Sequence, residues 1–104
     1  MPGVDFRAVR QAVSMQEVLD LIGFVAQVRT TDTLRGACPV HRSRSPRSRS
    51  FAVHLRRNMY HCFRCGAAGN QLDLYAAVTR QGVYDAAVDL CAKLHRDVPR
   101  VRRW

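Results

Sequence analysis

Two short pairs of metal-binding side chains lie near the middle of the chain. Cys38 and His41 are separated by two residues, and Cys62 and Cys65 repeat this spacing after 20 intervening residues. A two-residue spacer on a tight turn lets both side chains of a pair reach one ion, and zinc prefers four nitrogen or sulfur ligands in a tetrahedron. The spacing therefore predicts a single zinc ion bound by Cys38, His41, Cys62 and Cys65.

Other uses of these side chains are disfavoured by their positions. A disulfide between Cys62 and Cys65 would leave the first pair without a role. His54 or His61 is an alternative to His41 as fourth ligand, but His61 is next to Cys62 and would point to the opposite side of a strand. Three thiolates and one imidazole close the coordination shell, which favours a structural zinc over a catalytic one.

A metal ion would also supply stability that a chain of 104 residues needs. At this size a hydrophobic core alone gives marginal stability, whereas structural zinc in small peptides contributes ~10 to 16 kcal/mol of apparent binding free energy. Gly66, directly after Cys65, fits the turn that such a site requires. Cys91 lies among apolar residues at helical spacing, so we predict that it is buried and binds no metal.

The charge of the chain is strongly positive and unevenly distributed. The formal net charge is +9, and no Asp or Glu occurs between Asp32 and Asp73. A field of one sign attracts polyanions, so we predict that this segment binds nucleic acid. Arginines would contact phosphates and neighbouring rings would stack on bases, and the predicted residues are Arg42, Arg44, Arg47, Arg49, Arg56, Arg57, Arg64, Tyr60, His61 and Phe63.

The apolar periodicity predicts helices at both ends of the chain and strands between them. A helical pattern begins at Phe6, is renewed by a capping box at Ser14 and Glu17, and ends at Gly23. Period-two patterns predict short strands over 24–28, 33–37, 51–56 and 59–61, with Phe51 in the core and Phe63 either in the core or exposed. Helices follow over 71–80, capped by Asn70 and ended by Gly82, and over 83–94.

Several stretches match the pattern of a known family. They are GACPVH at 36–41, SP at 45–46, SFAV at 50–53, HCFRCGAAGN at 61–70 and AAVDLC at 86–91. At these residues the chain resembles the N-terminal zinc-binding domain of bacterial and phage DnaG-type DNA primases, over about residues 4 to 98. An apparent insertion at 47–49, Arg64 in place of the usual glycine and Asn70 in place of the usual aspartate depart from the family pattern.

The resemblance implies an α+β fold, a small zinc-ribbon antiparallel sheet flanked by N-terminal and C-terminal helices. It implies zinc ligation by the four residues named above and binding of single-stranded template DNA during primer initiation. We expect a primase-type zinc-binding domain over 1–98 and a basic tail or the start of a linker over 99–104. Eight acidic residues, placed mostly in the terminal helices, offer no site for nucleotidyl transfer, so this chain alone is not expected to be an enzyme.

The expected partners are single-stranded template DNA and a primase polymerase domain or a replicative helicase. We expect neither a membrane nor a small-molecule substrate, and we expect the cytoplasm as location because no secretory signal is evident. A first alternative is a zinc ribbon whose arginine surface docks an acidic replication or transcription protein. A second rests on RSRSPRSRS at 42–50, which resembles the Arg/Ser tracts of RNA-associated proteins.

Overall fold

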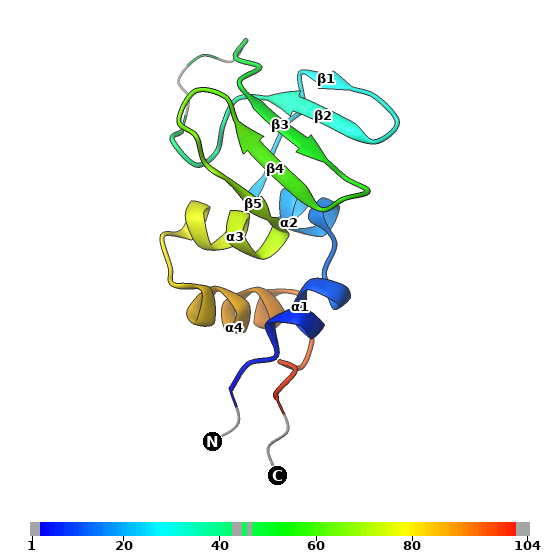
Figure 1. Ribbon diagram of the computed structural model, residues 1–104, viewed down its shortest axis with the longest axis vertical. Helices are drawn as coiled ribbons and strands as arrows, with labels where there is room; N and C mark the ends of the chain where they lie inside the picture. The colour runs from blue at the N-terminus through cyan, green and yellow to red at the C-terminus, as the bar shows by residue number, and fades with distance from the viewer. Residues whose placement is uncertain (1–2, 43–44, 46, 102–104) are drawn as a thin grey trace.

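A computed structural model describes residues 3–42, 45 and 47–101 of the chain. The molecule is elongated, with principal extents of 50 × 27 × 22 Å. Figure 1 shows a sheet at one end and four helices at the other. In chain order the elements are α1 (Phe6–Ala12), α2 (Met15–Ile22), β1 (Val28–Arg29), β2 (Thr33–Gly36), β3 (Phe51–His54), β4 (Met59–Cys62), β5 (Ala68–Asn70), α3 (Gln71–Thr79) and α4 (Val83–Lys93).

Each of the two N-terminal helices begins with a side-chain cap. The Asp5 carboxylate accepts the backbone N–H of Ala8 at the start of α1. The predicted capping box opens α2, where the Ser14 hydroxyl accepts the N–H of Glu17 and the Glu17 carboxylate accepts the N–H of Ser14. Gly23 then ends α2 in the left-handed conformation, with φ of 75°.

The five strands form one antiparallel sheet in the order β1-β2-β3-β4-β5. Successive strand residues point to opposite faces of a sheet. Phe51 and Val53 of β3 and Tyr60 and Cys62 of β4 are buried on the inner face. The outer face is more exposed and carries Arg35, Ala52, His54, Met59 and His61.

The helices α3 and α4 pack against each other at the far end of the molecule (Figure 1). Asn70 and Asp73 form a second capping box at the start of α3. Arg80, with φ of 56°, ends α3, whereas Gly82 is the N-cap of α4. The prediction that Gly82 ends α3 was therefore wrong by two residues, because Arg80 itself adopts the left-handed turn.

A single apolar core runs from the sheet into the helices. Its largest fully buried side chains include Phe51, Leu34, Leu72, Tyr75 and Leu90. Cys91 is 2% exposed within this core, which confirms its predicted role as a small buried residue.

The two ends of the described chain lie side by side. Val4 and Arg100 form an isolated antiparallel bridge, and the Asp5 N–H donates to the Pro99 carbonyl at 2.9 Å. Residues 99–101 of the expected tail therefore pair with the N-terminal segment, and residues 102–104 lie outside the described residues. None of the described helices is long and apolar enough to cross a membrane.

The α+β class and the antiparallel sheet with terminal helices are confirmed, but the bounds of all four predicted strands differ from the prediction, most of all for the first strand. The first strand begins at Val28 and not at Phe24, because Phe24 turns in against Phe51, with ring centroids 5.4 Å apart. The strand β5 was not predicted. Its three residues have weak strand propensity, yet they pair with β4 along Met59–Asn70, Tyr60–Gly69 and His61–Ala68.

Candidate zinc centre and nucleic-acid interface

The four predicted ligands come together at one end of the sheet. Their ligand atoms all lie within 4.8 Å of one another. The Cys38 and Cys65 sulfurs are 4.0 Å apart, and the Cys62 sulfur is 3.6 Å from His41 Nδ1. A tetrahedral ion with zinc–sulfur bonds of about 2.3 Å would hold two sulfurs about 3.8 Å apart, so this donor set fits one zinc ion.

Two strand ends place these ligands. Cys38 lies two residues after Gly36, the last residue of β2, and Cys62 is the last residue of β4. The second pair closes in a tight turn, where the Cys65 N–H points to the Cys62 sulfur at 3.4 Å and the Gly66 N–H donates to the Cys62 carbonyl at 2.9 Å. Gly66 has φ of 80°, a left-handed conformation that glycine adopts without strain, as the sequence predicted.

The alternative ligands and the disulfide find no support in the geometry. All four cysteines are free. The His61 ring stands edge-on to Phe63 with centroids 4.5 Å apart, and His54 Nδ1 accepts the backbone N–H of Arg57 at 3.3 Å. Neither histidine belongs to the cluster of ligand atoms.

The chain matches a known family model over residues 4–103, that of the CHC2 zinc finger of DnaG. The chain belongs to the CHC2 zinc-finger family of DnaG-type primases. Its three Cys and one His occur in the order that the family name states, and one structural zinc is the cofactor that this family and this cluster share.

Similar proteins agree with this membership. The chain is 33% identical to a DNA primase of Lactococcus lactis over 91 residues, which cover 86% of the chain and 14% of that primase. It is 31% identical to a DNA primase of Geobacillus stearothermophilus over 99 residues, covering 94% of the chain and 16% of the relative. The chain thus spans less than a fifth of the length of these relatives.

One solved structure has the same fold. It is the crystal structure of the Aquifex aeolicus primase, described as its zinc-binding and RNA polymerase domains. The match has a TM-score of 0.72 at 20% identity and covers 92% of this chain and 23% of that one. The residues described here therefore correspond to the zinc-binding domain of a primase and not to its polymerase domain.

The thiols of this CHC2 zinc finger differ in their readiness to lose a proton. Burial raises the pKa of Cys38 to about 11. Burial also opposes ionisation of Cys62, but the backbone N–H groups of Cys65 and Arg64 outweigh it and lower the pKa of Cys62 to about 6. Zinc binding requires thiolates, so a cysteine ligand that is still protonated loses its proton when the ion binds.

Beside the zinc finger, the outer face of the sheet carries a cluster of one arginine and two rings. The Phe63 ring is 63% exposed, and the Arg35 guanidinium carbon lies 5.2 Å from its centroid. The same guanidinium donates to the Arg49 carbonyl through Nε at 3.1 Å and Nη2 at 2.6 Å. Phe63, His61 and Arg35 thus form an exposed platform, which we call the ring platform.

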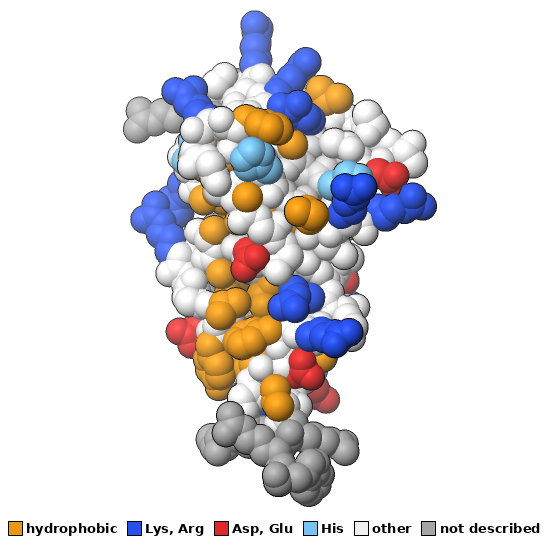
Figure 2. Space-filling model, in the orientation of Figure 1, with side chains coloured by type: hydrophobic (Ala, Val, Ile, Leu, Met, Phe, Trp, Pro, Cys, Tyr) orange, Lys and Arg blue, Asp and Glu red, His pale blue; other side chains and the backbone are white. Residues whose placement is uncertain are grey.

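The structure places the predicted nucleic-acid residues unequally. Arg42, Arg47, Arg49, Arg56, Arg57 and Arg64 are exposed around the sheet, as are His61 and Phe63, whereas Arg44 lies outside the described residues. Figure 2 shows Lys and Arg gathered mainly over the sheet end and Asp and Glu mainly over the helical end of the viewed face.

Tyr60 is not available for stacking and is a correction to the prediction. Its side chain is on the inner face, 5% exposed, with its ring 5.6 Å from that of Phe51, and burial raises its pKa to about 12. Tyr60 and His61 are neighbours on one strand, so only one of them can face outward.

Arg35 was missed when the predicted interface was assembled. Alternation along β2 places Arg35 on the face opposite to Leu34. In the structure Arg35 pairs with Ala52, which in turn pairs with His61, so all three lie on the outer face.

Proposed function

We propose that the ring platform and the arginines around it bind single-stranded template DNA in primer initiation during replication, in the cytoplasm. The observation that carries this proposal is the exposed ring of Phe63, which has both His61 and Arg35 as neighbours. Every base has a π-face, and stacking on an aromatic side chain contributes ~1 to 3 kcal/mol per base. The surrounding guanidinium groups supply charge to neutralise phosphates.

Several features support a base-stacking role over a purely structural one for Phe63. A large aromatic ring that is 63% exposed gains little from burial in the folded chain. The Phe63 N–H donates to the Ser50 carbonyl at 2.8 Å, so its backbone is fixed beside the sheet. A rigid ring next to cationic groups is the arrangement that sequence-tolerant single-strand binders use.

The direct test is fluorescence anisotropy with labelled single-stranded oligonucleotides. Phe63→Ala should weaken binding by about 5- to 150-fold, which corresponds to one lost stacking contact. The matched control is Tyr84→Ala, which removes a ring that is 50% exposed on α4, away from the sheet. Equal affinities of Phe63→Ala and the unaltered chain would exclude the ring platform as the binding surface.

Salt dependence provides a second readout of the same proposal. If the arginines neutralise about four phosphates, the logarithm of the affinity should fall with the logarithm of salt concentration at a slope of about −3. A slope near zero would exclude phosphate neutralisation. The same titration with RNA of matching sequence tests the alternative suggested by the Arg/Ser tract, which predicts tighter binding to RNA.

The remaining partners follow from the size of the relatives. We propose that this zinc finger acts with a primase polymerase domain or a replicative helicase, because the chain spans 14% of the lactococcal primase. The competing proposal is a protein-docking ribbon whose arginines meet an acidic partner. It predicts that an acidic replication protein binds while oligonucleotides at physiological salt do not.

A further inference from the structure

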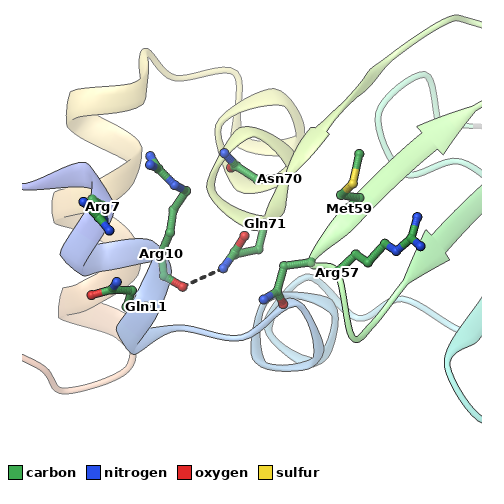
Figure 3. Close-up of a pocket in the computed structure, with 8 residues that line it drawn as sticks. Arg7, Arg10, Gln11, Arg57, Met59, Asn70 and Gln71 are labelled. Atoms are coloured by element: carbon green, nitrogen blue, oxygen red, sulfur yellow. Dashed lines mark hydrogen bonds between the residues drawn. The ribbon is translucent and has the colours of Figure 1, made fainter.

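A basic hollow lies beside the sheet, apart from the ring platform. It is formed between α1, the turn that joins β3 to β4, and the start of α3. Its volume is about 260 Å³. Three arginines and four amide side chains supply most of its lining, namely Arg7, Arg10, Arg57, Gln11, Asn58, Asn70 and Gln71. Figure 3 shows that these residues come from segments far apart in the sequence and meet around the start of α3.

Buried hydrogen bonds hold the walls of this hollow together. Gln71, which is 2% exposed, donates through Nε2 to the carbonyl of Arg10 at 2.8 Å (Figure 3) and to the carbonyl of Val13, also at 2.8 Å. On the opposite wall, Asn58 Oδ1 accepts the backbone N–H of Met15 at 2.9 Å. The hollow therefore exists before any ligand arrives, and its arginines need no rearrangement of the backbone to meet one.

The hollow carries positive charge without a compensating acid. The two ion pairs found in the described part of the chain join Lys93 to Asp89 and Arg96 to Glu17, so neither involves its three arginines. Two acids are close in sequence to its lining residues, and both cap helices: the Asp5 carboxylate accepts the Ala8 N–H at 3.1 Å, and the Asp73 carboxylate accepts the Asn70 N–H at 3.0 Å. Three arginines and no carboxylate line this hollow, and guanidinium groups supply the charge and donors that a phosphate requires.

The hollow is continuous with the proposed DNA-binding face. Arg57 and Met59 line it and also line a shallow depression on the outer face of the sheet, which includes His54 and His61. In Figure 3 the Arg57 side chain extends from the hollow toward the strands. Arg57 thus stands between the ring platform and the arginines of α1.

We propose that the hollow formed by Arg7, Arg10 and Arg57 binds a backbone phosphate of the same single strand whose bases stack on the ring platform. The strand then runs from Phe63 across Met59 to α1. This inference rests on the proposed function, and it adds a second contact that depends on the helical end of the molecule.

The test compares strands of increasing length, from ~4 to ~16 nucleotides of oligothymidylate, by anisotropy. The variant is the double substitution Arg7→Gln and Arg10→Gln. Its control is Arg29→Gln with Arg80→Gln, which removes the same charge from exposed positions outside the hollow. Zinc content and circular dichroism establish that both variants are folded.

We expect the first variant to bind the shortest strands like the unaltered chain and the longest strands about 10-fold more weakly. Its salt slope for long strands should be smaller by about 0.7 for each phosphate contact removed. The control should retain the gain of affinity with length, and Arg7→Lys with Arg10→Lys should restore most of it.

Three results would overturn the inference. Equal losses of affinity for long strands in the variant and the control would show that only net charge matters. If the affinity of the variant rises with strand length as it does for the unaltered chain, the hollow is excluded as a phosphate site. Binding of ATP that depends on Arg7 and Arg10, without any effect on oligonucleotide affinity, would assign the hollow to a free nucleotide. If the unaltered chain binds no strand of any length, the proposed function fails as well.

Discussion

The sheet end and the helical end of the molecule are stabilised by different means. At the sheet end, strands of two to four residues leave one face exposed, and the four zinc ligands occur there. At the helical end, α3 and α4 pack face to face through residues such as Leu72, Tyr75, Ala87 and Leu90, all at most 1% exposed.

This difference explains how a small domain can keep an exposed, cationic face. A sheet of short strands that is buried on only one face has too little apolar surface to be stable by burial alone. Zinc binding at one end of the sheet supplies the missing free energy of folding. The outer face can therefore carry arginines and rings in place of apolar residues. The helical end holds the larger apolar side chains of α3 and α4 within the shared core and supports the sheet.

The largest expected effect breaks the sheet end. Cys62→Ser removes a zinc ligand that is 0% exposed, and we expect a loss of more than about 4 kcal/mol in the free energy of unfolding. The matched control is Cys91→Ala, a buried cysteine of α4, which should cost far less and keep one zinc per chain. Thermal unfolding and zinc stoichiometry measure both.

Hydrogen exchange sharpens this comparison. In Cys62→Ser the amides of β3 and β4 should lose protection before those of α3 and α4, because only the strands depend directly on the metal. A uniform loss of protection through both ends would show that the two regions are not stabilised separately.

The next effect breaks the helical end. Leu90→Ala leaves a cavity at a side chain that is 0% exposed, and such substitutions cost about 2 to 5 kcal/mol. Zinc should remain bound, since Leu90 lies on α4 and the ligands lie at the opposite end of the core. Urea unfolding measures the loss, and zinc release from Leu90→Ala at a lower urea concentration than from the unaltered chain would contradict the expectation.

A smaller effect concerns the turn of the second ligand pair. Gly66 has φ of +80° with open space around its Cα, so Gly66→Ala should cost about 1 to 2 kcal/mol through backbone strain and weaken zinc binding. Gly82→Ala is the control, because Gly82 has φ of −67° and equally open surroundings. Competition with a chromophoric chelator measures the zinc affinity of each variant. Equal zinc affinities of Gly66→Ala and Gly82→Ala would show that the strain argument is wrong.

The smallest effect is a pH dependence at the helical end. The Ser14 N–H, followed by Arg96, holds the pKa of Glu17 below its usual value. Its contribution is therefore complete above the unfolded pKa of about 4.3 and lost as pH falls through the lower folded pKa. Because the pair is partly exposed, we expect less than about 1 kcal/mol.

The difference in unfolding free energy between the unaltered chain and Glu17→Gln measures this effect. It should shrink as the pH is lowered below about 4.3. Acid also protonates the zinc ligands, but it does so in both proteins, so the effect on zinc cancels in the difference. A difference in unfolding free energy that stays constant with pH would show that the ionised Glu17 carboxylate, in its ion pair and cap, is not the cause of that difference.

The sequence was sufficient wherever short-range chemistry determines the structure. The ligand spacing of Cys38, His41, Cys62 and Cys65, the capping box at Ser14 and the cap at Asn70 involve residues three apart, and each was predicted. Alternation along β3 likewise predicted that Phe51 is in the core, where it is 0% exposed.

Features that depend on distant segments were not predictable. The strand β5 exists because Gly69 lies opposite Tyr60, and Gly69, at φ of 153°, leaves no room for a Cβ beside Asp73. The late start of β1 depends on Phe24 packing over Gly36, where a Cβ would lie 3.0 Å from the ring. The hollow lined by Arg7 and Arg57 joins residues fifty positions apart.

The most direct test of the account is oligonucleotide capture before and after removal of the metal. Anisotropy with one labelled single strand should show binding by the protein that holds one zinc per chain, loss of binding after chelation, and recovery when zinc is returned. The ring platform is built on strands that the ion fixes, so capture and metal content should change together. Unchanged affinity in the metal-free protein would contradict the account.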